Sequence, residues 1–260
     1  MVVFFDIDGT IIDDDSQIIP TSAVEAIKAL RKNGHIPVVN TGRPYTHIDP
    51  RIKAMDFAGY VCACGMEIYL DGQWLARRKP APEICQKIRQ AALECNMRII
   101  YEADEATFLC DGLEFFSPAG QKDVQTMESK GFTVVEAEKV SDFRFTKFGC
   151  FPAPEDNRQE FQRRVAQWYY YIDRDTLWEF VMQGCSKAEG MLELVNYLGI
   201  PAEQTLAMGD SANDLAMFSA AKHTVCMGGG MEVLKEQAEY VTAPVLEDGL
   251  AKALRHYGLI

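Results

Sequence analysis

The sequence predicts an α/β protein built on a doubly wound parallel sheet, with an α+β segment inserted into it. Short, continuous apolar runs alternate with amphipathic helical segments at both ends of the chain. Residues 81–185 mix helical and β-like runs instead. Polar clusters directly follow several of the apolar runs. The alternation predicts strands buried between helices, and the polar clusters predict a site beyond the carboxyl ends of those strands.

The composition is that of a folded, acidic chain. It has 260 residues, a formal net charge of −12 and 48% hydrophobic residues, enough for one large domain or two modest ones. An acidic surface repels phosphate backbones and anionic lipid headgroups, and no basic patch opposes it. We therefore expect neither a nucleic-acid partner nor a membrane partner.

The start of the chain and its cysteines bear on the compartment. No basic region precedes the first apolar run, and no window approaches the roughly 18 apolar residues of a membrane span. Eight cysteines are scattered along the chain without zinc-site spacing. Only Cys62 and Cys64 are close, on alternate positions of an apolar run that reads as one strand. We expect a cytoplasmic protein with buried free thiols.

The N-terminal segment reads as a strand, a helix and a second strand. The run 2–5 suits a strand buried on both faces, and 36–40 suits a neighbouring parallel strand. Thr21 or Ser22 is expected to cap the helix between them, and Gly34 to end it. The apolar positions at helical spacing are Val24, Ile27 and Leu30.

The middle of the chain changes in texture. Residues 67–75 predict a hairpin that turns at Asp71-Gly72. Residues 83–95 and 155–168 read as helices. The short β-like runs between and after them are 98–101, 107–110 and 169–182.

The last third returns to the α/β pattern. A helix over 186–198 closes at Gly199, and a strand follows over 205–208. A second helix over 212–220 and a strand over 224–227 complete the pattern.

Two carboxylates follow the first strand. In the run Asp6-Ile7-Asp8-Gly9-Thr10, Asp6 and Asp8 project toward the same side of an extended chain. Such a pair can bind a metal, can act as a nucleophile with a general acid/base, or can end a strand in solvent.

Three further polar clusters occupy comparable positions: Thr41-Gly42-Arg43 after the second strand, Lys187 at a later helix start, and 209–214 after another strand. Alone, Lys187 is typical of a solvated first turn, Thr41 of a strand end, and Asp210 of a turn. The α/β pattern brings all of them to one edge of the sheet, which favours a shared site.

The motifs DIDGT, TGR, GCSKAEGM and GDSANDLAM, in this order, resemble the four motifs of the haloacid dehalogenase superfamily. The resemblance is greatest to its Cof-like sugar-phosphatase branch, which carries a large α+β cap between the second and third motifs. It implies a Rossmann-like core over 1–80 and 186–260 and an inserted cap domain over 81–185.

The resemblance also implies the activity, a Mg²⁺-dependent phosphatase of small phosphomonoesters, with sugar phosphates as the leading class. Asp6 would attack phosphorus to give an aspartyl-phosphate, and Asp8 would be the general acid and then the base. Mg²⁺ would be held by Asp6, the backbone carbonyl of Asp8, and Asp210, with Asp214 and Asn213 completing or orienting the shell.

The remaining expected roles concern the phosphoryl group. Lys187 would offset the charge of the carboxylates as a catalytic cation, and Thr41, Gly42 and Asn213 would contact the phosphate. Arg43 has two readings: it faces the phosphate or leaving group, or it caps the strand end.

The chain departs from the branch at three places. Cys64-Gly65-Met66 stands where relatives usually have Asn-Gly-Ala, and Gly228-Gly229-Gly230 where they have Gly-Asn-Ala. Pro244-Val245-Leu246 lacks an Asn usually found nearby. These departures concern the outer shell and substrate selection, because two amide donors are lost.

Aromatic residues crowd the end of the inserted segment, at 168–171 and at Trp178 and Phe180. Their alternation favours a sheet core over a stacking site for a sugar or base. Tyr170 and Trp178 are the candidates to face a substrate. The four histidines are isolated in sequence, and we assign none to catalysis.

Two alternative functions stay open. A phosphomutase would use the same phosphoaspartate chemistry, and a non-catalytic sensor would only bind phosphorylated metabolites. The expected partner in every case is a small phosphorylated metabolite, and no obligate protein partner is predicted.

Overall fold

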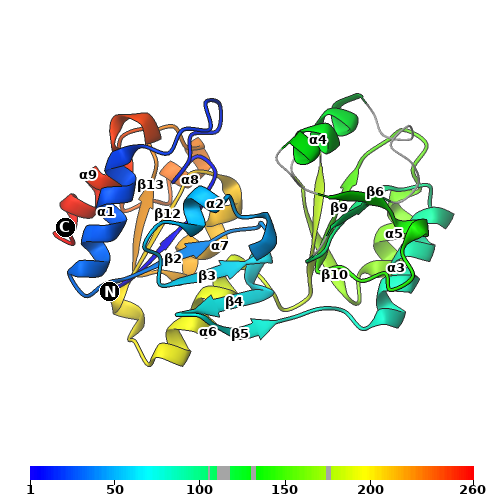
Figure 1. Ribbon diagram of the computed structural model, residues 1–260, viewed down its shortest axis with the longest axis horizontal. Coiled ribbons are helices and arrows are strands. Elements are labelled where there is room, and N and C mark those ends of the chain that lie inside the picture. Colours follow the sequence, from blue (N-terminus) through cyan, green and yellow to red (C-terminus); the bar gives the residue numbers. More distant parts are fainter. Residues whose placement is uncertain (105, 110–117, 130–132, 174–176) are drawn as a thin grey trace. The chain divides into compact units, whose positions relative to one another are not determined.

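The protein consists of two compact units, seen in a computed structural model that describes residues 1–104, 106–109, 118–129, 133–173 and 177–260 (Figure 1). The first unit combines Met1–Arg77 with Cys185–Ile260, and the second is Arg78–Gly184. The second unit is thus inserted in the first between strand β5 and helix α6.

The first unit is built on an eight-stranded sheet in the order β14-β13-β12-β1-β2-β3-β4-β5. The chain builds the sheet from β1 through β2 to β3, and later returns to place β12 on the other side of β1. The strand order therefore reverses between β1 and β12, which is where ligands bind in such sheets. The parallel strands are β1 (Val2–Phe5), β2 (Ile36–Asn40), β3 (Gly59–Cys62), β12 (Thr205–Gly209), β13 (His223–Cys226) and β14 (Tyr240–Val241), and the antiparallel ones are β4 (Glu67–Leu70) and β5 (Gln73–Arg77).

Helices cover both faces of this sheet, as the apolar strands predict. Val3 and Phe5 pack into one core cluster with α1 and α9, which lie side by side, and Val2 and Phe4 pack into another with α6 and α7 (Figure 1). The doubly wound α/β fold is thereby confirmed. The α-helices are α1 (Thr21–Lys32), α2 (Pro50–Lys53), α6 (Lys187–Leu198), α7 (Leu215–Ala220), α8 (Glu232–Lys235) and α9 (Gly249–His256), and the short 3-10 helices are η1 (Tyr45–His47), η2 (Ala63–Gly65), η5 (Ala202–Gln204), η6 (Ala212–Asp214) and η7 (Val245–Glu247).

The start of α1 differs from the prediction. Pro20, and neither Thr21 nor Ser22, occupies the N-cap, and no side chain caps the first turn. The fixed φ of proline starts the helix there, so Thr21 is already helical. Val24 is 40% exposed, because the buried face is formed by other positions. These are Ala23, Ala26, Ile27 and Leu30.

The hairpin forms as predicted, but Cys64 does not lie in the strand in which it was expected. Asp71 and Gly72 both have positive φ, 42° and 87°, as a two-residue hairpin turn with right-handed strand twist requires. Strand β3 ends at Cys62, so Cys64 is not its strand neighbour but lies in a left-handed turn with φ 54°. The seven described cysteines are buried and form no disulfide, as predicted, and Cys110 lies outside the described residues.

The second unit is a six-stranded sheet in the order β10-β11-β9-β6-β7-β8, packed with helices. Its predicted helix over 83–95 is confirmed, whereas the one over 155–168 is shorter. Helix α4 was not predicted, because Gly120 in its first turn is a poor helix former. The elements are β6 (Arg98–Glu102), β7 (Thr107–Leu109), β8 (Val134–Glu136), β9 (Lys147–Phe151), β10 (Tyr169–Asp173), β11 (Trp178–Met182), α3 (Pro82–Glu94), α4 (Pro118–Ser129), α5 (Arg158–Val165) and the 3-10 helix η4 (Ala137–Lys139).

The aromatic residues of this unit form its core. Tyr169, Trp178 and Phe180 are buried in the cluster that holds α3 and α5 to the sheet. The Tyr169 hydroxyl donates to the carbonyl of Thr146 at 2.8 Å. The core interpretation is therefore confirmed for these three residues, whereas Tyr171 is 42% exposed. The burial of Trp178 contradicts its place among the residues expected to face a substrate.

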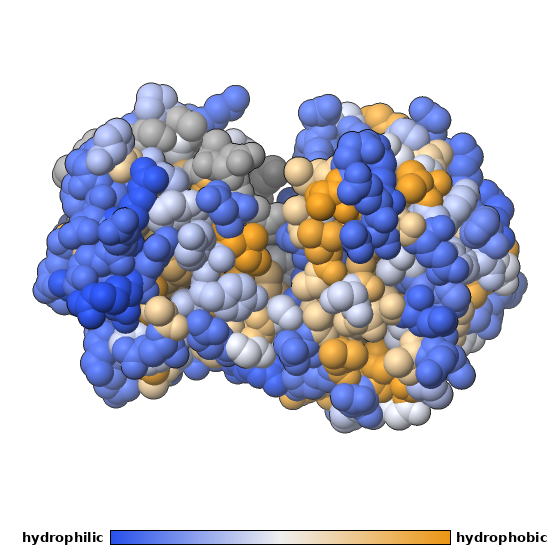
Figure 2. All heavy atoms as spheres, turned by 180° about the vertical axis from the view of Figure 1, so that it is seen from behind, coloured by the Kyte–Doolittle hydropathy of each residue, from blue (hydrophilic) through white to orange (hydrophobic). Residues whose placement is uncertain are grey.

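Within the described part of the chain, no helix has the length and apolar character needed to cross a bilayer. Figure 2 shows one face of the protein, on which hydrophilic residues separate the hydrophobic ones into patches.

Candidate active site

The predicted site begins at the reversal of strand order in the first unit. Asp6 directly follows β1, and its backbone N–H donates to Met208 on β12 at 3.0 Å. Asp210 directly follows β12. The two parallel strands are in register, so their carboxyl ends place both aspartates at the same edge of the sheet.

Helix α6 brings Lys187 to these carboxylates. The Lys187 Nζ lies 2.8 Å from Asp6 Oδ1 and 2.6 Å from Asp214 Oδ1, and the lysine side chain is only 2% exposed. Lys187 is the first residue of the helix, and Ser186 caps it by accepting from the N–H of Glu189 at 3.0 Å. The predicted lysine is thus a buried cation shared by two carboxylates.

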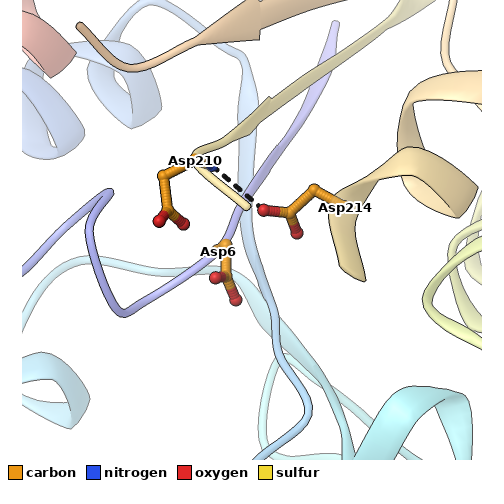
Figure 3. Close-up of side chains that lie close together, drawn as sticks. All are labelled: Asp6, Asp210 and Asp214. Carbon is orange, nitrogen blue, oxygen red and sulfur yellow. Dashed lines mark hydrogen bonds between the residues drawn. The ribbon is translucent and has the colours of Figure 1, made fainter. Parts of the chain in front are cut away.

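The loop after β12 is folded around Asp214. Its Oδ2 accepts from the N–H group of Asp210 at 3.0 Å (Figure 3). The same oxygen accepts from the N–H of Ser211 at 3.3 Å, while Oδ1 faces Lys187. The Asp210 carboxylate differs, because its Oδ1 is buried without a hydrogen-bond partner among the described residues. Asp6, Asp210 and Asp214 each place one carboxylate oxygen within 4.8 Å of the others.

Three carboxylates thus face one ammonium group, and burial, followed by this excess of negative charge, shifts pKa values in the site. Burial raises the pKa of Asp6 to about 7 against the opposing effect of Lys187. Burial, followed by the charges of Asp6 and Asp214, raises the pKa of Asp210 to about 8. Burial alone would lower the pKa of Lys187, but the two adjacent carboxylates outweigh it and raise that pKa. A further positive charge in the site would therefore be electrostatically favourable.

Gly9 allows Asp210 to approach the loop that carries Asp6. Its φ is +66°, and a Cβ atom there would lie 2.4 Å from Asp210 Oδ2. Any other residue would strain the backbone and push the carboxylate away. The glycine of the first motif is thus required by the site itself.

Asp8 lies beside Arg43. The Arg43 Nε donates to Asp8 Oδ2 at 2.8 Å, and its Nη2 lies 2.5 Å from Asp8 Oδ1. The pair is partly open, with the Asp8 side chain 39% exposed. Arg43 therefore makes a two-pronged contact that neither sequence reading contained, and the Asp8 carboxylate is separate from the three converging ones.

The remaining predicted residues organise the loops. Thr41 is buried, and its Oγ1 accepts from the N–H of Arg43 at 3.2 Å across Gly42. Asn213 Oδ1 accepts from the Ser211 hydroxyl at 2.7 Å. The phosphate contacts expected of Thr41, Gly42, Arg43 and Asn213 stay predictions.

Comparison with known proteins places this geometry in a family. The family of haloacid dehalogenase-like hydrolases matches residues 3–254, nearly the whole chain. The chain belongs to this family.

Named relatives agree with this assignment. The 5-amino-6-(5-phospho-D-ribitylamino)uracil phosphatase YcsE of Bacillus subtilis (strain 168) is 26% identical, over 99% of this chain and 96% of the relative. Two solved structures share the fold. The HAD phosphatase BT1666 of Bacteroides thetaiotaomicron has a TM-score of 0.85 and is 24% identical, over 100% of this chain and 95% of that one. The HAD subclass IIB sugar phosphatase BT4131 has a TM-score of 0.80 and is 24% identical, over 100% of this chain and 99% of that one. The prediction of a phosphoric monoester hydrolase of this family is confirmed.

The family motifs did not point to Asn40. This residue ends β2, is fully buried, and its Nδ2 donates to the main-chain carbonyl of Lys187 at 3.0 Å. The signal in the sequence was a single amide at the end of an apolar strand, directly before Thr41. The TGR motif begins one residue later, at Thr41, so the motif does not include this amide.

Two of the departures from the branch pattern have structural consequences. A Cβ atom on Gly230 would lie 2.7 Å from the carbonyl oxygen of Asp210, whereas one on Gly229 would meet nothing within 4 Å. Cys64 adopts the left-handed conformation that asparagine, its usual counterpart in the branch, accepts more readily.

Proposed function

We propose that this hydrolase is a Mg²⁺-dependent phosphatase of small phosphomonoesters, with sugar phosphates as the leading class, that acts through an aspartyl-phosphate on Asp6. The observation that carries the proposal is the Asp6 carboxylate, which Lys187 contacts at 2.8 Å beside Asp210. The Lys187 contact favours the ionised form of Asp6 against the opposing effect of burial, and it orients the carboxylate while one oxygen is kept for attack.

The donor set fits Mg²⁺. Asp6 and Asp210 would hold the ion together with the backbone carbonyl of Asp8, because hard oxygen donors are what Mg²⁺ prefers. Asp210 Oδ1 is buried without a partner among the residues described, as expected of a ligand atom. Asp214 would orient this shell through Lys187 and the Asp210 loop. When bound, Mg²⁺ would supply positive charge against the transferring phosphoryl group.

The protein groups account for the covalent chemistry in two steps. In the first, an Asp6 oxygen bonds to phosphorus while the bond from phosphorus to the substrate oxygen breaks, and Asp8 gives a proton to the departing alcohol. In the second, Asp8 takes a proton from water as the water oxygen bonds to phosphorus and the bond to Asp6 breaks. Inorganic phosphate leaves, and both aspartates return to their initial state.

The phosphate cradle would be formed by the residues around this pair. Lys187 offsets charge on the phosphoryl oxygens, and Thr41, Gly42 and Asn213 contact them. Arg43 lies against Asp8, so it would sit beside the leaving group and orient the acid/base.

The domain assignment supports a division of labour. We assign 1–80 and 186–260 to the catalytic core and 81–185 to an inserted cap that selects the substrate. The division of the chain into compact units at Arg77 and Cys185 supports these limits. Of the two cap residues expected to face a substrate, Tyr170, which is partly buried, remains the candidate.

The names of the relatives support a phosphorylated polyol or sugar as substrate. YcsE is named for a phosphoribitylamino substrate, and BT4131 is described as a sugar phosphatase. The described cysteines form no disulfide, which supports a cytoplasmic location, where thiols stay reduced.

A screen of phosphorylated metabolites with Mg²⁺, measuring released phosphate and comparing kcat/KM, tests the proposal. One strongly preferred sugar phosphate is the expected result. Turnover that needs a bisphosphate activator would indicate a phosphomutase. Tight binding without phosphate release would indicate a sensor.

A further inference from the structure

The amide of Asn40 joins the sheet to the helix that carries Lys187. Its Nδ2 lies 3.0 Å from the main-chain oxygen of Lys187, and the residue is fully buried. A carbonyl oxygen can only accept, so the amide nitrogen must face it. The same residue that supplies the buried ammonium is thus fixed through its backbone.

The pleat of the sheet determines this contact. Val38, two residues before Asn40 on β2, packs in the core cluster of α6, and so does Phe4, two residues before Asp6 on β1. Because side chains alternate along a strand, Asn40 and Asp6 project on the same side, toward α6. In the β1–β2 ladder Phe5 pairs with Val39, so the residues that follow are neighbours.

A closed ring of contacts results. It runs from Asp6 through the β1–β2 ladder to Asn40, across the amide to the Lys187 carbonyl, and along the lysine side chain back to Asp6. A helix that slid by a fraction of a turn would break the ring at the amide before it changed the strands. The ammonium position is therefore set by the Asn40 contact as well as by the carboxylates.

The other side of the first turn of α6 is held by close backbone packing. A Cβ on Gly65 would lie 2.4 Å from the Ser186 carbonyl oxygen, and a Cβ on Gly190 would lie 2.6 Å from Gly65 Cα. The 63–65 turn thus contacts the helix start directly. This packing limits sideways movement of the helix start.

The chemistry of Asn40 argues against a role in packing alone. Its Oδ1 is buried without a hydrogen-bond partner in the described structure, which is unfavourable for stability. An apolar residue would fill the strand end without that penalty. The hydrogen bond from the Asn40 amide to the Lys187 carbonyl explains why an amide stands there despite this cost.

We propose that Asn40 is a positioning residue: its amide fixes the first turn of α6 so that the Lys187 ammonium meets Asp6 and Asp214. This inference rests on the proposed function for its effect on turnover, because Lys187 would act on the phosphoryl group. Its structural part, the placement of Lys187, is independent of the reaction.

The kinetic test compares Asn40→Ala and the similarly sized Asn40→Leu with Asn33→Ala. Asn33 donates to the carbonyl of Leu259 at 2.9 Å, so the control removes the same kind of bond away from the site. We expect the Asn40 variants to lose roughly 10- to 100-fold in kcat, with KM changed by less than about threefold. Asn33→Ala should keep the wild-type kcat. Equal kcat values for the Asn40 variants and Asn33→Ala would overturn the proposal.

A double substitution identifies the route of the effect. Asn40→Ala in a Lys187→Arg background should cost less than about threefold further, since the lysine it positions is already gone. A full additional loss, equal to that in the wild-type background, would mean that Asn40 acts independently of Lys187 and would refute the proposal.

A labelling measurement separates this inference from the proposed function. Lys187 and Lys147 are both almost fully buried, at 3% and 4% exposure, so each should react slowly with acetic anhydride. Mass spectrometry of the Asn40 variants should show faster acetylation at Lys187 while Lys147 stays protected. Unchanged protection of Lys187 would overturn the inference even in a protein without phosphatase activity. A wild-type protein that releases no phosphate, but shows this labelling change, would contradict only the proposed function.

Discussion

Arg43 contacts both carboxylate oxygens of Asp8, at 2.8 Å from its Nε and 2.5 Å from its Nη2. An arginine in this geometry holds the plane of the carboxylate as well as its charge. The proposed acid/base is therefore oriented by a residue of the neighbouring strand end, apart from the three carboxylates that surround Lys187.

Replacing Asp6 tests the nucleophile. Asp6→Asn should lower kcat by at least about 10³-fold, because an amide oxygen is a poor nucleophile. Phosphate release measures it, and circular dichroism checks the fold. Asp56→Asn, which changes an exposed aspartate paired with Arg31, is the matched control and should keep full activity. Near wild-type turnover in Asp6→Asn would contradict the mechanism.

Replacing Asp8 should separate the two chemical steps. With p-nitrophenyl phosphate the leaving group needs little protonation, so Asp8→Asn should still form the aspartyl-phosphate but hydrolyse it slowly. Rapid-mixing absorbance should then show a burst of one nitrophenolate per site, followed by slow turnover. With an alkyl phosphate the same variant should be nearly inactive. A wild-type steady-state rate on that substrate would rule out Asp8 as acid/base.

The raised pKa of Asp210 predicts how stability depends on pH. A folded-state pKa of about 8 lies well above the unfolded value of about 3.9, so the folded protein binds this proton more tightly. Stability from this group is present at low pH and is lost as the pH rises toward 8. Metal-free protein in EDTA should therefore show a melting temperature that falls between pH 5 and about 8.5, and added Mg²⁺ should stabilise it more at the high end.

Asp210→Asn is the control for this dependence. Removing Asp210 should make the fall in melting temperature shallower, with the remainder due to Asp6, whose pKa is also raised, and should weaken the effect of Mg²⁺. Parallel curves for the variant and the wild type, with and without Mg²⁺, would show that Asp210 is neither the strained group nor a metal ligand.

The glycine run 228–230 offers a matched pair of substitutions. Gly229→Asn, which restores the residue usual in the branch, should change the free energy of unfolding by less than about 0.5 kcal/mol, since its Cβ meets nothing within 4 Å. Gly230→Ala should cost about 1–3 kcal/mol, because its Cβ would press on the carbonyl of Asp210. Urea unfolding measures both. Equal losses would contradict the packing described for this turn.

The sequence predicts those site residues that combine a reactive or charged side chain with a position at a strand end or a helix start. Asp6, Asp210 and Lys187 follow buried strands or begin a helix, and the topology alone brings such positions to one edge. The contact between Arg43 and Asp8 could not be predicted, because it depends on rotamers of two loops that are adjacent only in the folded sheet.

The missed features depend on local backbone geometry or on three-dimensional neighbours. Asn40 reads as an ordinary strand end until α6 is packed beside it. Pro20 displaced the expected cap of α1, since a fixed φ favoured an earlier start. The left-handed turn at Cys64 ended a strand that its apolar sequence would have continued.

The boundary between the two units lies very close to the buried lysine. The chain leaves the inserted unit at Gly184, which has a φ of +77°, and Lys187 follows three residues later. Any pull on the chain at this boundary reaches the first turn of α6 before any other part of the core. The Ser186 cap and the Asn40 amide tie that turn down on either side of the lysine backbone. These two contacts hold the first turn of α6 in place, so that changes in the shape or sequence of the inserted unit need not displace the Lys187 ammonium from Asp6.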